Sequence, residues 1–187
     1  MTDTTTVLDI PGYKTGTWVL DPSHSEVTFS VRHMMISKVR GTFGMKSATI
    51  VAPENPLEAT VEASVDVTSV DTKDEGRDNH LRSADFFDIE NHPTMDFRST
   101  GVRLKDDDFL VDGDLTIRGV TKPATFELEF NGFGVDPWGS YKAGATAKTV
   151  VNREDFGLTW NAALETGGVL VGKDVTIALE LQVSLQA

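Results

Sequence analysis

The stretch LEATVEASVDVT, residues 57–68, decides the fold class, because its residues alternate strictly between two kinds. One set is apolar and consists of Leu57, Ala59, Val61, Ala63, Val65 and Val67. The other set is polar and consists of Glu58, Thr60, Glu62, Ser64, Asp66 and Thr68. Successive side chains of a β-strand point to opposite faces, whereas a helix would scatter these charges around its circumference. The stretch therefore predicts a strand with one buried and one solvated face.

The same alternation recurs along most of the chain. It predicts further strands over residues 27–33, 43–51, 97–103, 109–117, 126–131, 141–148 and 169–185. The residues Lys105-Asp106-Asp107-Asp108 lie between two of these segments and indicate a hairpin turn. Together the segments make about eight strands at hairpin spacing, which favours an all-β antiparallel barrel or sandwich.

One interval interrupts the alternation, between Asp71 and Pro93. Asp74 is a suitable N-cap for a short helix, and Pro93 would end any helix before it. We therefore predict a short helical insertion around residues 74–90. No linker divides the chain, so residues 1–187 are expected to form a single domain, with residues 1–15 as a flexible N-terminal segment.

The inward strand faces leave open whether the interior is filled or hollow. Bulky residues such as Phe29, Phe43, Phe97, Phe126 and Phe130 share these faces with many small ones. The small residues include Ala59, Ala63, Ser99, Gly113, Gly132, Ala143, Ala145 and Ala147. A cavity lined in this way suits an apolar ligand, but bulky residues opposite the alanines would give a dry core instead. His33 shares the face of Phe29 and Val31 and could lie at a cavity mouth.

Composition excludes several classes of function. The chain has 187 residues and a formal net charge of −12, so it repels nucleic acid. It has no cysteine, which excludes disulfides, thiolate nucleophiles and iron–sulfur clusters. No apolar run approaches the roughly 18 residues of a transmembrane helix. No secretory signal is seen, so we expect a cytoplasmic protein.

Most candidate chemical motifs have simpler explanations. The four histidines, His24, His33, His80 and His92, lack chelating spacing, so no metal site and no cofactor are expected. GGVLVGKD at 167–174 nearly matches a phosphate loop, but strand-like alternation follows where a helix is needed. Asp21, Ser23 and His24 resemble a catalytic triad only in composition.

A polar cluster, DEGRDNHLRSAD at 74–85, is interpreted as a helix surface with internal ion pairs. The alternative is a lid over a ligand, in which Arg77, His80 or Arg82 contacts a polar head.

The sequence resembles the YceI family of lipocalin-like, polyisoprenoid-binding proteins over nearly its whole length. The matching stretches are WVLDPSHSEVTFSVRHM at 18–34, TSVDTKDEGRDNHLRSADFF at 68–87, HPTMDF at 92–97, GDLTIRGVTKP at 113–123 and VNREDFGLTWN at 151–161. The resemblance implies an extended, eight-stranded, antiparallel lipocalin-like barrel with a helical insertion. It also implies an elongated pore that holds a long isoprenoid-like chain, such as an isoprenoid quinone or a polyprenyl chain. It implies no catalytic residue.

The leading hypothesis is therefore a protein that carries, stores or protects an apolar lipid. A second copy of the chain, in a homodimer, is a further candidate partner. The predicted ligand-lining residues are Phe29, Val31, His33, Phe43, Met45, Phe97, Phe126, Phe130, Ala143, Ala145 and Ala147, with His33 assigned to the polar head. A second hypothesis is an enzyme with His33 as general base, which requires a carboxylate or hydroxyl partner for the imidazole. A third is a structural protein with a filled barrel and no ligand.

Overall fold

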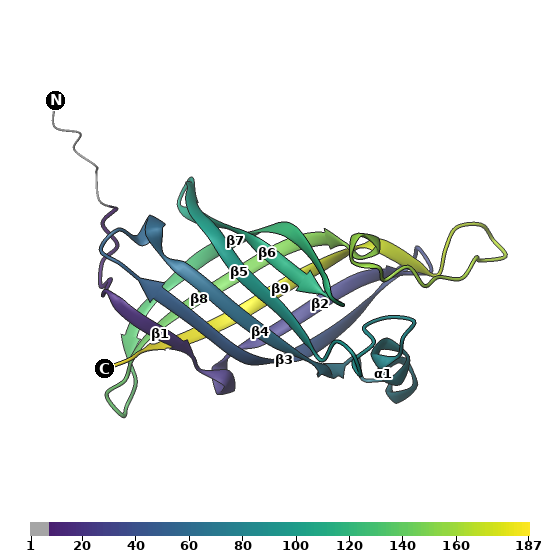
Figure 1. The fold of residues 1–187 in the computed structure, drawn as a ribbon, viewed down its shortest axis with the longest axis horizontal. Coiled ribbons are helices and arrows are strands. Elements are labelled where there is room, and N and C mark those ends of the chain that lie inside the picture. Colours follow the sequence, from purple (N-terminus) through teal and green to yellow (C-terminus); the bar gives the residue numbers. More distant parts are fainter. Residues whose placement is uncertain (1–7) are drawn as a thin grey trace.

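The computed structural model of the protein describes residues 8–187, in which one antiparallel sheet of nine strands curls on itself (Figure 1). The strands are β1 (Gly16–Leu20), β2 (Glu26–His33), β3 (Ser37–Ala52), β4 (Thr60–Asp71), β5 (Thr94–Lys105), β6 (Asp108–Ile117), β7 (Val120–Val135), β8 (Tyr141–Asn152) and β9 (Val171–Leu185). Their order is β1-β3-β2-β9-β8-β7-β6-β5-β4, with further pairings of β1 to β9 and of β3 to β4.

Eight of the strands form a closed barrel, because β4 pairs with β3 on one side and with β5 on the other. The ninth, β1, pairs with the end of β3 near Ala52 and with the end of β9 near Leu185. β2 pairs with the remaining lengths of the same two strands. Since β1 and β2 follow one another between β3 and β9, they act as one interrupted strand. The predicted eight-stranded lipocalin-like barrel is confirmed.

The stretch that predicted the fold forms β4, except at its beginning. Val65 and Val67 are buried, whereas Glu62 is exposed, as the alternation requires. The predicted start at Leu57 is wrong, because Pro56–Glu58 forms a 3-10 helix. The Asn55 side chain accepts a hydrogen bond from the Leu57 N–H, and proline fixes the backbone at the first helical position. This local capping outweighs the strand pattern.

The predicted helical insertion is confirmed as α1 (Glu75–Arg82), for which Asp74 is the N-cap, but the helix ends at Arg82 and residues 83–90 form turns instead. The Asp74 side chain accepts a hydrogen bond from the Arg77 N–H, which is the expected N-cap contact. Asp78 is buried and accepts hydrogen bonds from the N–H (2.8 Å) and hydroxyl (2.5 Å) of Thr72. These bonds hold α1 against the end of β4, at the end of the barrel opposite the two termini (Figure 1).

Part of the predicted flexible N-terminal segment contacts the barrel. The Tyr13 hydroxyl donates to the carbonyl of Pro53, and the Tyr141 hydroxyl donates to the carbonyl of Gly12, both at 2.6 Å. Residues 1–7 of that segment lie outside the described residues.

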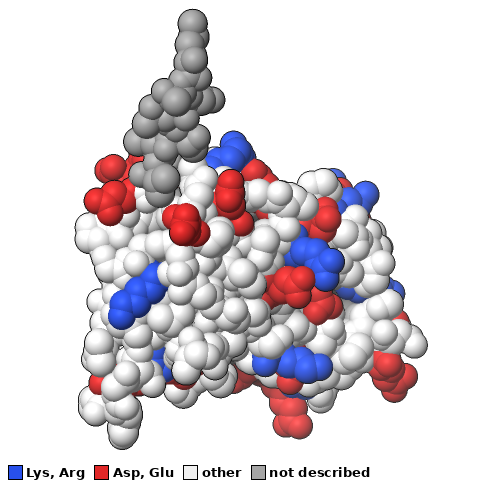
Figure 2. All heavy atoms as spheres, turned by 60° about the vertical axis from the view of Figure 1, so that its left-hand side comes forward, with Lys and Arg blue, Asp and Glu red and all other residues white. Residues whose placement is uncertain are grey.

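The glutamate side chains that the alternation places on the outward face are exposed. Glu58, Glu62, Glu127 and Glu129 are all exposed. On the side shown in Figure 2, acidic and basic side chains are scattered among uncharged ones rather than gathered into a field of one sign. Within residues 8–187, no helix has the length and apolar character needed to cross a bilayer.

Candidate functional site

A cavity of about 470 Å³ lies inside the barrel at the end covered by α1. Its walls come from β2, β3 and β9, from α1 and the residues after it, and from the segment between β8 and β9. Most lining residues are apolar: Val27, Phe29, Val31, Val39, Phe43, Leu81, Phe86, Phe87, Met95, Ile117, Val151, Phe156, Leu158, Trp160, Leu170, Val171, Val175 and Ile177. The polar lining residues are Arg32, His33, Asp74, Arg77, His80 and Arg153. The hollow interior that the sequence left open is therefore present at this end.

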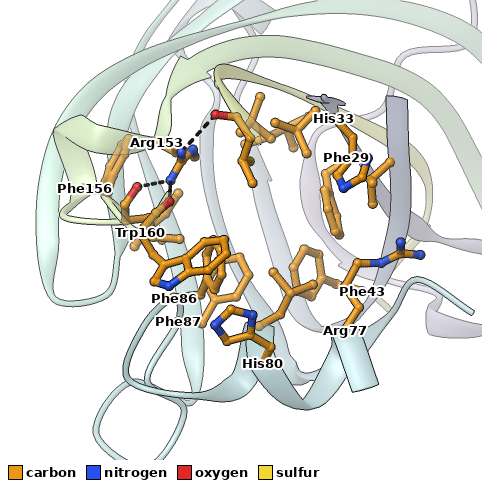
Figure 3. Close-up of a pocket in the computed structure, with 18 of the residues that line it drawn as sticks. Phe29, His33, Phe43, Arg77, His80, Phe86, Phe87, Arg153, Phe156 and Trp160 are labelled. Atoms are coloured by element: carbon orange, nitrogen blue, oxygen red, sulfur yellow. Dashed lines mark hydrogen bonds between the residues drawn. The ribbon is translucent and has the colours of Figure 1, made fainter. Parts of the chain in front are cut away.

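Aromatic side chains from two segments meet at the covered end of the cavity. The His80 ring of α1 lies edge-on to Phe86 and to Trp160, with centroid distances of 5.0 and 4.7 Å. Phe86 and Trp160 also contact each other at 5.4 Å. Edge-to-face contacts of this kind are favourable beyond the area they bury. They join α1 to the segment between β8 and β9, so these two segments together cover part of this barrel end (Figure 3).

Arg153 holds the second of these segments in place. It lies in the 3-10 helix Arg153–Phe156 and is 5% exposed. Its guanidinium donates to the carbonyls of Leu158 (2.6 Å), Trp160 (3.0 Å) and Val171 (3.3 Å) (Figure 3). It also donates to the carbonyl of Gly172 (2.7 Å). Burial lowers the pKa of Arg153, and the charge of Glu154 opposes this shift. With four backbone acceptors, the buried cation is satisfied without a carboxylate partner.

Two of the three residues from the predicted polar cluster line the cavity, and each also has an internal partner. Arg77 donates to the hydroxyl and the carbonyl of Thr72, both at 2.8 Å, and His80 Nε2 lies 2.9 Å from Asp85 Oδ2. Arg82 is not a lining residue and instead donates to carbonyls of β4. The internal contacts of the first interpretation are therefore present at Arg77 and His80, and the contact with a ligand's polar head stays a prediction.

His33 lines the cavity, as predicted, but lacks the geometry of a general base. Ser37 donates to its backbone carbonyl, and within residues 8–187 no carboxylate or hydroxyl is hydrogen-bonded to its ring. A catalytic histidine is usually oriented by such a partner. The hypothesis of an enzyme with His33 as general base therefore lacks the contact that it requires.

A second cavity, of about 160 Å³, lies toward the other end of the barrel, near the N-terminal segment. Tyr13, Trp18 and Phe133 are among its lining residues, together with Val61, Val111 and Leu128 from the middle of the barrel. Its lining residues are almost all apolar.

The predicted lining residues do not all surround one cavity. Phe29, Val31, His33 and Phe43 line the larger cavity, and Phe130, Ala143 and Ala145 line the smaller one. Met45, Phe97, Phe126 and Ala147 line neither. Met45 is packed in the core cluster of the larger cavity's end, and the other three belong to a cluster in the middle of the barrel.

The expected continuous pore is thus corrected to two cavities with packed side chains between them. The Phe97 and Phe126 rings meet edge to face at 5.0 Å, and Ala147 packs in the same cluster. Bulky side chains from β5 and β7 therefore fill the space beside this alanine. We call Phe97, Phe126 and Ala147 the septum.

Sequence reasoning missed several lining residues, including Phe86, Phe87, Arg153, Phe156, Leu158 and Trp160. None of them lies on an alternating strand face, so periodicity gave no reason to select them. They do lie in two of the stretches that carry the family resemblance, residues 68–87 and 151–161. Those stretches contain aromatic and charged residues that alternation leaves unexplained, which is the signal that could have found them.

The rejected motifs are explained by local structure. Asp21, Ser23 and His24 do contact one another, but Ser23 Oγ and Asp21 Oδ2 both lie 3.0 Å from the same ring nitrogen, Nδ1, of His24. A catalytic triad needs them on opposite ring nitrogens. Hydrogen bonds from Ser23, His24 and Lys142 hold the pKa of Asp21 well below its usual range, as expected of a cap in an ion-pair network.

The phosphate-loop resemblance also has a local explanation. Residues 167–174 lead into β9 rather than into a helix, so the phosphate-binding helix N-terminus is missing. Within residues 8–187, no group of three or more histidine, aspartate or glutamate side chains is placed to hold a metal ion.

Comparison with known proteins agrees with this architecture. The family model described as a YceI-like domain matches residues 18–183. A UPF0312 protein of Staphylococcus aureus (strain N315) is 37% identical over 171 residues, which cover 90% of this chain and 97% of the relative.

Solved structures share the fold. A Campylobacter jejuni YceI protein superposes with a TM-score of 0.66 at 26% identity, over 83% of this chain and 90% of that one. Burkholderia cenocepacia BcnA gives a TM-score of 0.75 at 20% identity, over 87% and 98% of the two chains. A domain from Saccharophagus degradans that is described as polyisoprenoid-binding gives 0.68 at 14% identity, over 90% and 98%.

Proposed function

The chain belongs to the YceI-like domain family, and from this premise we propose that it binds a long apolar lipid, a polyisoprenoid such as an isoprenoid quinone or a polyprenyl chain, inside the barrel. The observation that carries the proposal is the cavity of about 470 Å³ with its mostly apolar walls. Ligand sites of proteins range over roughly 300–1,000 Å³ and are lined in the same way. The description of the Saccharophagus degradans neighbour as polyisoprenoid-binding supports the choice of ligand class.

The energetic argument favours a hydrocarbon chain over a polar ligand. Burying apolar surface contributes about 25 cal/mol per Å², and no directed hydrogen bonds are needed. A chain that enters at the α1 end would run past Phe29 and Phe43 and meet the septum. The septum would therefore limit how much of the chain the larger cavity holds.

Polar lining residues mark where the ligand's head would lie. His33 on β2 and His80 and Arg77 on α1 are contributed by separate walls of the cavity (Figure 3). Arg77 and His80 are engaged with Thr72 and Asp85, whereas the His33 ring has no such partner among the described residues. We therefore assign His33 to a hydrogen bond with an oxygen of the head, such as a quinone carbonyl or a phosphate.

Native mass spectrometry tests the proposal directly. Protein purified without detergent is expected to carry an added mass that lipid extraction identifies as an isoprenoid. If the purified protein is empty and takes up no isoprenoid quinone when one is supplied in excess, the proposal is wrong.

Replacing His33 with alanine distinguishes the contribution of the ligand's polar head to binding from that of its apolar chain. We expect His33→Ala to weaken the binding of an isoprenoid quinone about tenfold, as the loss of one hydrogen bond to a buried acceptor predicts. Binding of squalene, an isoprenoid hydrocarbon without a polar head, should be unchanged. Competition with a fluorescent fatty-acid probe measures both affinities. Equal losses for the quinone and squalene would contradict the assignment of His33 to the head.

A further inference from the structure

The turn between β2 and β3 exposes three consecutive apolar side chains. Met34, Met35 and Ile36 are 43%, 54% and 80% exposed, and Val169, from the neighbouring segment, is 37% exposed. The Met34 N–H donates to the carbonyl of Leu170 at 2.7 Å, so the turn and this segment are joined. We call Met34, Met35, Ile36 and Val169 the apolar tip. A cluster of exposed apolar residues on a protein's surface commonly marks an interaction site.

The backbone of the tip makes this choice of residues unusual. Met34 and Met35 have φ values of +53° and +64°, in the left-handed region where glycine and asparagine are preferred. Long apolar side chains at these two positions do not favour the left-handed turn conformation. They also contribute little to the packing of the core, because they are largely exposed. Their presence is better explained by a contact made outside the protein.

The charge around the tip is opposite to that of the whole chain. From residue 27 to residue 53 there is no Asp or Glu, although the chain carries a net charge of −12. The same stretch contains Arg32, Lys38, Arg40 and Lys46, all exposed. Within residues 8–187, none of these four side chains forms a salt bridge. The β2–β3 hairpin therefore presents free positive charge.

Two of these charges stand directly opposite one another. Arg32 and Lys38 are cross-strand partners of β2 and β3, and like charges in such positions disfavour the sheet. β9 and the segment before it carry acidic residues, Asp174 and Glu165, but within residues 8–187 neither forms a salt bridge with Arg32 or Lys38. An external anion would relieve the repulsion between these two residues.

The tip also adjoins residues that line the larger cavity. Arg32 and His33 precede Met34 in β2 and line the cavity, as do Leu170 and Val171, which follow Val169. The residues of the tip are thus continuous with both walls of the cavity at the α1 end. A ligand passing through this end would pass beside the tip.

We propose that the apolar tip inserts into the interface of an anionic lipid bilayer, while Arg32, Lys38 and Arg40 contact the lipid phosphates. This combination of an apolar edge and flanking basic residues is how peripheral proteins bind membranes. The acidic remainder of the chain does not prevent it, because exposed charges are screened beyond about 8–10 Å at physiological salt. Docking in this orientation places the α1 end of the cavity against the source of the apolar lipid.

The other end of the barrel provides a matched comparison. The turn between β7 and β8 exposes Val135 (68%) and Trp138 (86%), so it is also apolar. This turn lies beside two carboxylates, Asp136 and Asp21. The Lys142 ammonium forms a salt bridge with each of them, so it is already paired. Apolar exposure is thus present at both ends. Among residues 8–187, the β2–β3 turn combines it with several unpaired basic side chains, whereas the basic side chains beside the β7–β8 turn are Lys142, which is paired, and Lys14, whose ammonium lies 4.0 Å from the centre of the Tyr141 ring.

Vesicle flotation tests the proposal whether or not the cavity holds a ligand. We expect the wild type to float with vesicles of phosphatidylcholine plus phosphatidylglycerol, and to bind pure phosphatidylcholine vesicles at least about tenfold more weakly. A variant with Met34→Asn, Met35→Asn and Ile36→Ser should bind the anionic vesicles at least about tenfold more weakly than wild type. Asparagine tolerates the left-handed backbone, so this variant should melt no earlier than wild type.

Two controls separate the contributions. Val135→Ser with Trp138→Ser should leave flotation unchanged, and Lys38→Gln with Arg40→Gln should abolish the preference for anionic vesicles. The proposal is overturned if the tip variant floats like wild type, or if the Val135 and Trp138 variant is the one that loses binding. Native mass spectrometry of the same variants reports ligand content separately, so a failure of docking is distinguishable from a failure of lipid binding.

Discussion

Replacing Arg153 with methionine is expected to lower the free energy of unfolding by about 3 kcal/mol. Methionine retains much of the apolar volume of the side chain but removes every donor. The carbonyls of Leu158, Trp160, Val171 and Gly172 then lose their shared partner inside the protein. Each unsatisfied buried acceptor costs about 1–3 kcal/mol, and partial access of water to the four carbonyls keeps the total below their sum.

Chemical denaturation measures this loss, and hydrogen exchange locates it. Amides of residues 153–171 should exchange faster in Arg153→Met than in wild type, whereas those in the middle of β6 and β7 should change much less. Arg153→Lys is the matched control, since it keeps the charge and can satisfy some of the carbonyls. A variant Arg153→Met with wild-type stability and unchanged exchange would show that the guanidinium does not hold this segment.

Replacing Val175 with tryptophan is expected to weaken lipid binding by more than about tenfold without destabilising the barrel. Val175 is on β9 and faces the larger cavity, so an indole at this position occupies space that the ligand needs. Burial is worth about 0.8 kcal/mol per methylene, so excluding even one isoprene unit weakens binding by more than about tenfold. The added apolar contacts fill a void, so the melting temperature should be unchanged or higher.

The control is the same substitution on the outer face. Val150 on β8 is 56% exposed. Its cross-strand partner is Thr176, the residue that directly follows Val175 in the sequence. Val150→Trp adds the same indole outside the barrel and should bind the isoprenoid quinone like wild type, as measured by the probe competition. Undiminished binding in Val175→Trp would place the ligand elsewhere and contradict the assignment of this cavity.

Local sequence signals were accurate wherever neighbouring residues decide the outcome. The alternation in β4 and β9, the Asp74 cap of α1 and the hairpin turn between Lys105 and Asp108 all follow from contacts within a few residues. The error at Leu57 has the same kind of cause, because the Asn55 cap and Pro56 are local signals as well. His33 was placed at the cavity for a similar reason, since its register with Phe29 is a property of one strand.

The arrangement of the cavities depends on contacts between distant parts of the chain. Ala143, Ala145 and Ala147 are equivalent in sequence, yet the first two line the smaller cavity and Ala147 packs in the septum. The difference arises from Phe97 and Phe126, which β5 and β7 bring together in the middle of the barrel. No periodicity along β8 contains that information.

The strand pattern by itself determined antiparallel strands with charge on one face and small residues among the inward ones, because strand alternation and capping are short-range effects. The choice of a barrel over a sandwich came from the family resemblance. Only the tertiary structure decided that the interior holds two cavities, and that α1 and the segment anchored by Arg153 cover the larger one. Whether space beside a small side chain stays empty depends on which side chain faces it across the barrel. That partner comes from a remote strand and is fixed only when the barrel closes.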